Sequence, residues 1–438
     1  MGKGTNSSLI SKQYALYLSR YAHQFEYLGN ETVAKNLSTV VTVPCYNEPD
    51  ILTTLKSLHL CHPTKFPVEI LILINHPEGS GPNVINQNNK SYAEVKEWIG
   101  THNDGHKKFH LILSGDLPKK YAGVGLARKI VMDEAIRRLS RSQMFNGVVA
   151  GLDADSICDQ NYLREIEHFF LNDPKTNGAN IYFEHPLKMD YNNKKEIGIA
   201  SYELHLRYMV HSLRYAGFPY AFHAIGSSLA VRGIAYVKQG GMNRRKAGED
   251  FYFLQKIIPL GNFGEINTTR IIPSGRESDR VPFGTGKAMM KWSKSSENIF
   301  KTYNPEIYEE LFSLFSGISN LFDSEQQELI RYYEELGICM KEFISLADWI
   351  RNLNEIQNES TSLKTFRYRF FQWMNGLKTL KFIHYARDAR YKNVPVLEAY
   401  QWLKKQIGLN DINIDNVFAG LIELRNFDKE NPRYYKSE

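Results

Sequence analysis

Two aspartates separated by one residue follow an apolar run near position 150. Asp153 and Asp155 come directly after residues 148–152, a run that predicts a buried strand. Two carboxylates at this spacing can share a hard divalent cation such as Mg²⁺ or Mn²⁺, which takes oxygen ligands and commonly links protein carboxylates to a diphosphate. An isolated Asp-x-Asp is more often a turn or a helix cap. Its position at a strand end favours a metal site, with Asp155 as the more direct ligand.

Polar residues also follow two other apolar runs, 39–43 and 68–74, each of which predicts a buried strand. A strand-to-helix turn would explain the first of these polar segments equally well. Residues 75–90, rich in Gly, Pro and Asn, predict a long polar loop. The residues at the strand ends are Pro44, Tyr46, Asn47 and Glu48 after the first run, and Asn75 after the second.

Arginines stand in two glycine-containing segments. Gly123 and Gly125 precede Arg128 at the start of a predicted helix, where glycines and a helix N-terminus would let a phosphate approach the backbone. Farther on, Arg276 and Arg280 lie in a stretch punctuated by Gly and Pro. Guanidinium groups there would pair well with phosphate oxygens. The plainer alternatives are a surface salt bridge for Arg128 and an interdomain linker for the later stretch.

The elements that carry these residues alternate between strand-like and helical patterns. This alternation predicts an α/β fold with a doubly wound, mainly parallel sheet. In such sheets ligands bind outside the carboxyl ends of the strands. The polar segments that follow the strands should therefore meet at one edge. The predicted strands are 39–43, 68–74, 109–113, 147–152 and 179–183, and the predicted helices are 9–28, 125–139 and 162–171.

Taken in order, these segments resemble the motifs of the family 2 glycosyltransferases and their GT-A-fold relatives. Residues 43–48, Val-Pro-Cys-Tyr-Asn-Glu, are similar to the family's strand followed by Pro-x-Tyr-Asn-Glu. Residues 122–129 resemble its Gly-x-x-x-Ala-Arg-Asn helix start, with Lys129 in place of Asn. The segment 222–232 and the following pair Glu249-Asp250 resemble its acceptor-side half. The resemblance spans about residues 38–286 and is specific as an ordered set.

The resemblance implies transfer of a sugar from a nucleotide-diphosphate sugar to an acceptor hydroxyl, with inversion in one displacement. Asp250 would be the general base, which must reach the hydroxyl proton and stay ionised until attack. Glu249 is the weaker candidate for the base and would hold the site together, although acidic residues at a helix start are also common as caps. No histidine matches the family's third metal ligand, since only His384 follows Asp250. The implied donor-binding residues are Pro44, Tyr46, Asn47, Glu48, Asn75, Arg128, Asp153, Arg276 and Arg280, the metal ligands are Asp155 and Asp153, and the acceptor-side residues are Gly226, Ser227 and His223.

The chain of 438 residues is long enough for more than one core. We expect an N-terminal helical extension at 1–37, a GT-A-like catalytic domain at 38–286 and a C-terminal helical domain at 287–438. Around Trp292 the Gln-x-x-Arg-Trp motif of processive relatives is not matched, which favours a non-processive enzyme. The helical patterns of the last domain are 308–322, 325–336, 339–353, 365–377, 396–407 and 414–424.

Composition narrows the class of protein further. A net charge of +6 with only short basic clusters argues against a nucleic-acid binder. The four cysteines form no CxxC pair, which argues against a zinc site or a disulfide framework and fits a reducing cytosol. The chain shows neither a signal-peptide core nor an apolar run of about 18 residues. We expect a cytoplasmic protein, peripheral at the inner face of the membrane if its acceptor is a lipid-linked glycan.

The resemblance to the family 2 glycosyltransferases implies a hexosyltransferase-like enzyme that uses Mn²⁺ or Mg²⁺ and acts in cell-surface polysaccharide biosynthesis. A nucleotidyltransferase can share a similar sheet and paired aspartates. It would more often carry a Gly-rich, basic loop after the first strand, which residues 44–48 lack. A non-catalytic carbohydrate- or protein-binding scaffold would bind nucleotides too weakly to detect with metal present. The donor base, the sugar, the acceptor and the linkage have no readable signal in the sequence.

Overall fold

The computed structural model describes residues 3–278, 284–296, 299–409 and 414–436. The chain forms two compact units. The sheet unit consists of Met1–Pro186, Ala224–Met290 and Phe427–Ser437, and the helical unit consists mainly of Leu187–His223 and Lys291–Asn426. The chain therefore passes between the units more than once. The boundaries of functional domains drawn from the sequence stay predictions.

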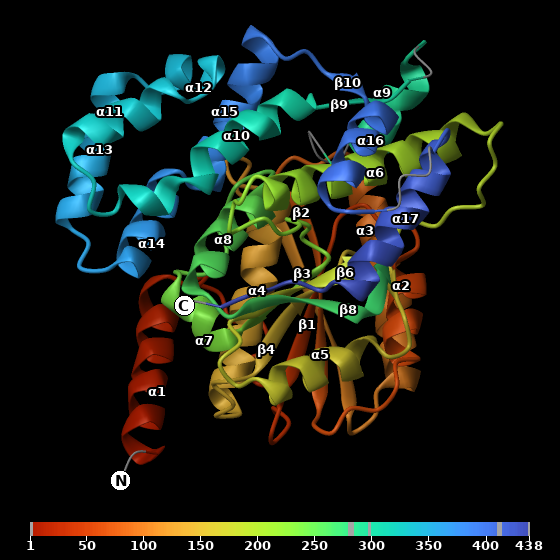
Figure 1. The fold of residues 1–438 in the computed structure, drawn as a ribbon. Helices are drawn as coiled ribbons and strands as arrows, with labels where there is room; N and C mark the ends of the chain where they lie inside the picture. Colours follow the sequence, from red (N-terminus) through yellow and green to blue (C-terminus); the bar gives the residue numbers. More distant parts are fainter. Residues whose placement is uncertain (1–2, 279–283, 297–298, 410–413, 437–438) are drawn as a thin grey trace. The chain divides into compact units, whose positions relative to one another are not determined.

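The sheet unit is built on a mixed, mostly parallel sheet (Figure 1), so the predicted α/β class is confirmed. In the described residues the strand order is β11-β8-β6-β7-β4-β1-β2-β3. Neighbours from β4 to β3 are parallel, as are β6 and β8, whereas β7 runs antiparallel between β4 and β6. The strands are β1 Thr39–Cys45, β2 Val68–Pro77, β3 Lys107–Leu117, β4 Val148–Gly151, β6 Gly178–Phe183, β7 Leu229–Arg232 and β8 Phe263–Ile272, with the short strands β5 Ile157–Cys158 and β11 Tyr434–Tyr435 paired to β8.

Strand β1 lies at the centre of the parallel part and aligns the ends of its neighbours. Cys45 pairs with Ile74 of β2, and Thr42 pairs with Gly151 of β4. The Leu152 amide continues this contact by donating to the Thr42 carbonyl at 3.1 Å. Because these strands run in the same direction, the polar residues that follow them emerge at the same edge of the sheet. This is the edge where ligands bind in open α/β sheets.

Helices flank the strands of the sheet unit, and two of them differ from the prediction. Residues 75–90 are not a long loop, because β2 continues to Pro77 and α3 (Pro82–His102) begins at a proline, which is favoured at a first helical position. Few apolar residues mark the first turns of α3, so its periodicity is weak. The first helix, α1 (Lys3–Arg20), ends eight residues before the predicted end at 28. The remaining helices of this unit are α2 Ile51–His59, α4 Val124–Arg141, α5 Tyr162–Asn172, α7 Gly233–Lys238 and α8 Glu249–Ile257.

Helix α4 is buried along most of its length although it carries many charged residues. The buried charges are paired. Asp133 accepts hydrogen bonds from the hydroxyls of Tyr17 (2.6 Å) and Tyr236 (2.8 Å) and forms an ion pair with Lys129 at 2.9 Å. Arg138 contacts the buried Glu69 of β2 at 2.6 Å. Since a buried charge without a partner is costly, these pairs fix the position of α4 between α1 and the sheet.

The helical unit contains the helical patterns expected after residue 287, with different boundaries. The predicted helix 339–353 is two helices, because Ser345 caps a new helix by accepting from the Asp348 amide. The predicted helix 365–377 also ends early, and Asn375 caps its successor. A 22-residue helix, α6, had no sequence prediction. The helices are α6 Lys194–Tyr215, α10 Pro305–Ser316, α11 Gln326–Glu334, α12 Ile338–Phe343, α13 Leu346–Asn358, α14 Leu363–Trp373, α15 Gly376–Ala389 and α16 Val396–Gln406. Helices α9 Thr285–Lys294 and α17 Val417–Glu430 each contain a boundary between the two units.

Helix α6 is the centre of the helical unit and packs against α10 and α16. Its Glu203 is buried and accepts from Arg207 and Arg425, each at 2.7 Å.

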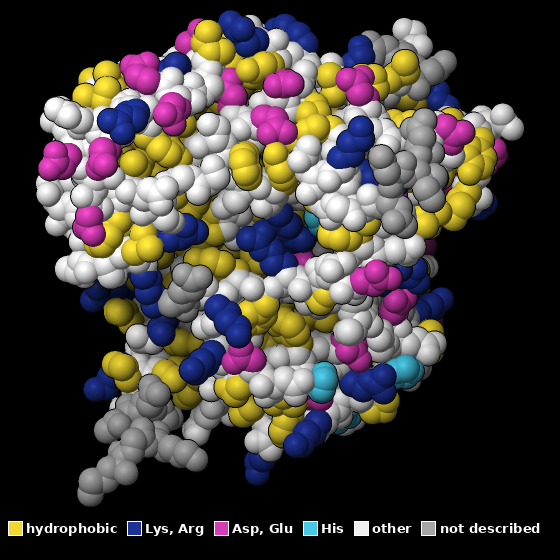
Figure 2. Space-filling model, in the orientation of Figure 1, with side chains coloured by type: hydrophobic (Ala, Val, Ile, Leu, Met, Phe, Trp, Pro, Cys, Tyr) yellow, Lys and Arg dark blue, Asp and Glu magenta, His cyan; other side chains and the backbone are white. Residues whose placement is uncertain are grey.

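On the face drawn in Figure 2, Lys and Arg side chains are scattered among Asp and Glu rather than gathered in one stripe. In the described parts of the chain, no helix is both long and apolar enough to span a bilayer.

Candidate active site

Arg128, in the second turn of α4, connects three segments that the sequence singled out. Its guanidinium donates from Nε to Oε1 of Glu249 at 2.9 Å, from Nη1 to the Gly226 carbonyl at 3.0 Å, and from Nη2 to Oδ1 of Asp153 at 2.5 Å. The side chains of Arg128 and Glu249 are buried, whereas that of Asp153 is partly exposed. The planar five-donor group suits this arrangement, because its hydrogen bonds have fixed directions.

The glycines around Arg128 are needed because segments of the chain approach one another closely. A Cβ atom at Gly125 would lie 2.2 Å from the carbonyl oxygen of Arg245, and one at Gly226 would lie 2.4 Å from Nη2 of Arg128. At Gly151, a Cβ would lie 2.6 Å from the Gly226 carbonyl. The segment that lies against Gly125 at the start of α4 is therefore the loop before α8.

Asp250 follows Glu249 in the first turn of α8, and the residue keeps some exposed surface although protein atoms enclose most of its carboxyl group. Burial and then the neighbouring Glu249 carboxylate raise the pKa of Asp250 to about 7, although Arg128 and the Phe251 amide act in the opposite direction. That amide donates to Oδ1 of Asp250 at 2.8 Å. A carboxyl group with this pKa can accept a proton near neutral pH and release it again, which is what a general base requires.

Arg128 stays charged in this environment. Burial alone would lower its pKa, but the carboxylates of Asp153, Glu249 and Asp250 raise it above its ordinary value. The three carboxylates and one guanidinium leave an excess of negative charge when Asp250 is ionised. Such a site attracts a cation or a proton.

A second guanidinium lies at the end of β1. Arg276 donates from Nη2 to Oε2 of the buried Glu48 at 2.6 Å and lies 3.6 Å from Oδ2 of Asp155. The other Glu48 oxygen, Oε1, accepts from the Asp50 amide at 3.0 Å. The structure thus brings together the residues after β1, the second aspartate of the pair and the segment after β8. Arg280, the other predicted arginine, lies outside the described residues.

Asn88 of α3 holds the ends of β1 and β2 together and was missed by the sequence analysis. Its Oδ1 accepts from the Asn47 amide at 2.9 Å, and its Nδ2 donates to the Asn75 carbonyl at 2.9 Å. Asn47 has a φ of 49°, in the left-handed region that Asn adopts more readily than most residues. Oδ1 of Asn75 is buried and has no hydrogen-bond partner among the described residues. An unsatisfied buried acceptor at a strand end is consistent with a donor supplied by a ligand.

The remaining predicted residues are placed in different ways. Pro44 belongs to β1, and Tyr46 follows that strand with its side chain partly exposed. Gly226 and the buried Ser227 belong to the sheet unit, close in sequence to β7. His223 is the last residue of a segment of the helical unit, and the acceptor-side role of these residues stays a prediction.

Asp153 and Asp155, after β4, are the two metal ligands that the sequence analysis predicts. Among the described residues no group of three or more His, Cys, Asp or Glu side chains is arranged to hold a metal ion. Each aspartate faces a guanidinium: Asp153 that of Arg128 and Asp155 that of Arg276. Two carboxylates fit a Mg²⁺ ion that takes its other ligands from phosphates and water, as such ions usually do.

Comparisons with known proteins give only weak likenesses. No protein-family model and no curated protein matches the chain. Among solved structures, S. aureus TarS residues 1–349 in complex with UDP-GlcNAc matches with a TM-score of 0.37 and 11% identity, over 80% of this chain and 92% of that one. The same fragment in complex with UDP gives 0.33 and 11%, over 81% and 93%. The S. aureus TarS structure without that truncation gives 0.32 and 12%, over 80% and 55%. Scores of this size carry no argument about function.

Proposed function

We propose that this protein is a glycosyltransferase that moves a sugar from a nucleotide-diphosphate sugar to an acceptor hydroxyl. The observation that carries the proposal is the Arg128 guanidinium, which joins Asp153 at the end of β4 to Glu249 beside Asp250. It connects residues suited to hold the donor with a residue suited to accept a proton. A reaction that combines diphosphate departure with proton removal from a hydroxyl needs both.

The donor half of the proposed site lies at the carboxyl ends of β1, β2 and β4. Asp153 and Asp155 would hold Mn²⁺ or Mg²⁺, which supplies positive charge to a departing diphosphate when it is bound. Arg276 would exchange its contact with Asp155 for one with the diphosphate, because guanidinium pairs strongly with phosphate oxygens. Asn75 and Tyr46, at the ends of neighbouring strands, would contact the nucleoside.

The catalytic half is Asp250. In the proposed reaction its carboxylate takes the proton of the acceptor hydroxyl while the oxygen attacks the sugar, in one displacement that inverts the anomeric centre. Its raised pKa favours this role, since a stronger base removes the proton more effectively once it is ionised. Glu249 would keep Arg128 in place through their hydrogen bond.

The acceptor is proposed to be a glycan, free or lipid-linked, extended by one sugar in each encounter. Gly226, Ser227 and His223 are the proposed acceptor-side residues. If the acceptor is a lipid-linked glycan at the inner face of a membrane, the protein needs only peripheral contact with the bilayer.

Binding and turnover of nucleotide sugars test this proposal. Thermal-shift titrations with UDP, GDP, CDP, ADP and dTDP in the presence of Mn²⁺ should show a raised melting temperature for one base, because a ligand stabilises the state that it binds. Release of the preferred nucleoside diphosphate from its sugar conjugate, with UDP-GlcNAc as the first donor assayed, should then require the metal. Asp155→Ala and Asp250→Asn should both lose this activity, whereas Asp323→Asn, at an exposed site of the helical unit, should keep it. Full activity in the first two variants would contradict the site.

A further inference from the structure

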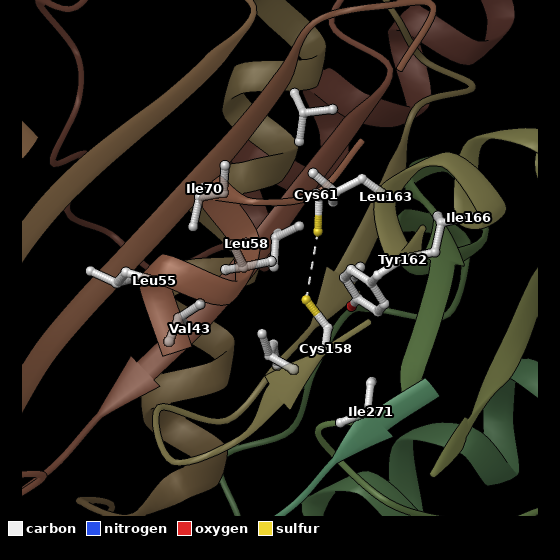
Figure 3. Packing of buried hydrophobic residues seen from close by; sticks show 14 of the residues in the cluster. Val43, Leu55, Leu58, Cys61, Ile70, Cys158, Tyr162, Leu163, Ile166 and Ile271 are labelled. Carbon is white, nitrogen blue, oxygen red and sulfur yellow. Dashed lines mark hydrogen bonds between the residues drawn. The ribbon is translucent and has the colours of Figure 1, made fainter. Parts of the chain in front are cut away.

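Two buried cysteines from distant parts of the sequence face each other beside the proposed donor site. Cys61 follows α2, Cys158 belongs to β5, and their sulfur atoms lie 3.7 Å apart (Figure 3). Their exposed fractions are 3% and 8%. Leu58, Tyr162 and Leu163 are among the apolar side chains around the pair in Figure 3. The two sulfur atoms therefore point toward each other inside a packed cluster.

The backbone around each cysteine is held in place by hydrogen bonds. The Cys158 amide donates to Oγ of Ser57 at 3.3 Å, and Ser57 Oγ also lies 3.6 Å from the Cys158 sulfur. On the other side, Nζ of Lys107 donates to the Cys61 carbonyl at 2.8 Å. Disulfide formation would require the sulfur atoms to approach to about 2.0 Å.

The hydrogen bond between the two sulfur atoms shifts the pKa values of the two thiols in opposite directions. The bond to Cys158 lowers the pKa of Cys61 despite its burial, and the same bond, together with burial, raises the pKa of Cys158. A thiolate is the reactive form of cysteine. Cys61 is therefore the sulfur that reacts first, and Cys158 is the sulfur that resolves the product.

We propose that Cys61 and Cys158 form a reversible disulfide when a small hydroperoxide oxidises the protein. The Cys61 thiolate attacks one peroxide oxygen, the O–O bond breaks, and hydroxide or an alkoxide leaves while Cys61 becomes a sulfenic acid. The Cys158 sulfur then attacks the Cys61 sulfur and forms the S–S bond. The sulfenic oxygen leaves as water with the Cys158 proton. An added dithiol reverses the reaction by thiol–disulfide exchange.

The position of this bond gives it an effect on the proposed active site, and this part of the inference rests on the proposed function. Cys158 lies three residues after Asp155, and Thr54 of α2 donates to the Ala154 carbonyl at 2.8 Å. Strand β5 also pairs with the end of β8, at Ile271 and Ile272, shortly before Arg276. A disulfide would fasten the turn that carries Asp155 to α2 and restrict its adjustment to a metal or a diphosphate.

Peptide mapping of the full chain tests the bond without any nucleotide. The folded protein is treated with hydrogen peroxide, remaining thiols are alkylated after denaturation, and a protease digest is examined by mass spectrometry. We expect a Cys61–Cys158 linked peptide that dithiothreitol removes, and a melting temperature raised on the order of 5 °C. Recovery of both cysteines as separate alkylated or sulfinic-acid peptides would overturn the proposal.

Single substitutions test which cysteine reacts with the peroxide and which one resolves the sulfenic acid. In Cys158→Ser the sulfenic acid cannot be resolved, so dimedone should label Cys61. In Cys61→Ser the hydrogen bond to Cys61 is lost, but burial still raises the pKa of the Cys158 thiol, so dimedone labelling of Cys158 should be lower than that of Cys61 in the other variant. Cys339→Ser, at a buried cysteine of the helical unit, should leave the linked peptide unchanged. Equal labelling in the two variants would contradict the assignment, and the wild-type map remains decisive if a variant fails to fold.

Nucleotide binding tests the effect of the Cys61–Cys158 disulfide on the donor site independently of whether the disulfide forms. Oxidised and reduced protein are titrated by calorimetry with Mn²⁺ and the nucleoside diphosphate that gives the largest thermal shift, and an affinity difference of about fivefold or more is expected if the bond restrains Asp155. A linked peptide with equal affinities would overturn the effect on the site and leave the disulfide standing. Absence of binding by all five nucleoside diphosphates in both forms would count against the donor assignment, which the mapping result does not use.

Discussion

Nη2 of Arg128 lies 2.5 Å from Oδ1 of Asp153, and this contact links the helix start after β3 to the end of β4. The same guanidinium holds Glu249, so one side chain sets the distance between the proposed donor and catalytic halves of the site. The three hydrogen-bond partners of Arg128, which are Asp153, Gly226 and Glu249, lie 25, 98 and 121 residues away along the chain. The site therefore depends on the tertiary packing of α4 as much as on the residues themselves.

Replacement of Arg128 should impair both folding and activity. Arg128→Met leaves the buried Glu249 carboxylate without its partner, which should cost about 3–5 kcal/mol of unfolding free energy. Arg128→Lys keeps the charge but not the three directed hydrogen bonds, so it should fold and still lose about 100-fold in transfer rate. Chemical denaturation and initial-rate assays measure the two effects. Arg331→Lys, at an exposed site, is the control, and a fully active Arg128→Lys enzyme would show that the contacts are dispensable.

The pH dependence of transfer should follow the ionisation of Asp250. Its pKa of about 7 predicts a rate that rises as the pH increases through 7, because only the carboxylate accepts the proton. A pH–rate profile of kcat/KM between pH 5 and 9 measures this, with Asp250→Asn giving no rate above background. A wild-type profile that is flat across neutral pH would count against Asp250 as the base.

Asp250 should also lower the stability of the protein above neutral pH. The folded-state pKa of about 7 lies above the value of 3.8 expected for an exposed aspartate, so the group's stabilising contribution is complete at low pH and is lost as the pH rises through 7. The Asp250→Asn variant has no carboxyl group to ionise at this position, so it does not lose stability in this way as the pH rises. The variant should therefore melt at a higher temperature than the wild type at pH 8, and the difference should shrink toward pH 5. A difference in melting temperature that grows toward acid pH would contradict this prediction.

Gly125 should tolerate no side chain. A Cβ atom there would meet the Arg245 carbonyl at 2.2 Å, so Gly125→Ala must displace the loop before α8 and with it Glu249 and Asp250. We expect at least about 2 kcal/mol of destabilisation, typical of overpacking, together with a loss of activity. Gly100→Ala, in helix α3, is the matched control, because nothing lies within 4 Å of a Cβ at that position and alanine favours helix by about 0.5–1 kcal/mol. Urea titrations of the two variants should move in opposite directions.

Arg276 should matter for donor affinity more than for folding. Its side chain is 46% exposed but its partner Glu48 is buried, so the test is Arg276→Lys, which keeps a positive charge beside Glu48 and should change stability by less than about 1 kcal/mol. Loss of one charge-assisted contact to the diphosphate should weaken donor binding about tenfold. Calorimetric titration with the preferred nucleoside diphosphate and Mn²⁺ measures this. An unchanged dissociation constant would remove Arg276 from the donor site.

The sheet was largely predictable because its central strands are buried on both faces and read as continuous apolar runs. The convergence of their polar ends followed from the direction of parallel strands alone. Helices with little apolar periodicity were harder to find. The start of α3 is rich in Asn and Gln and was taken for a loop, so Asn88 was missed although it links the ends of β1 and β2.

The glycines before Arg128 show a different limit of sequence reasoning. Their spacing indicated a close approach correctly, but the approaching group is the chain at Arg245 and Lys246. Lys129 departs from the family pattern, and its amine pairs with the buried Asp133. Arg245 and Lys246 lie more than a hundred residues from these glycines, so no local pattern contains them. Lys129 and Asp133 are a local i,i+4 pair within α4, but the contact of Asp133 with Tyr17 of α1 arises only from tertiary packing. Glu48 and Arg276 likewise could be listed as candidates but not paired.

The most direct test of the proposed function is metal-dependent release of a nucleoside diphosphate from its sugar conjugate. Wild-type protein and Asp155→Ala would be assayed with the donor whose nucleotide gives the largest thermal shift, with Mn²⁺ and after its removal by EDTA. The account predicts release by the wild type with metal only, and a rate at least about 100-fold lower in the variant. Equal rates in the two proteins, or pyrophosphate release from a nucleoside triphosphate in place of sugar transfer, would contradict it.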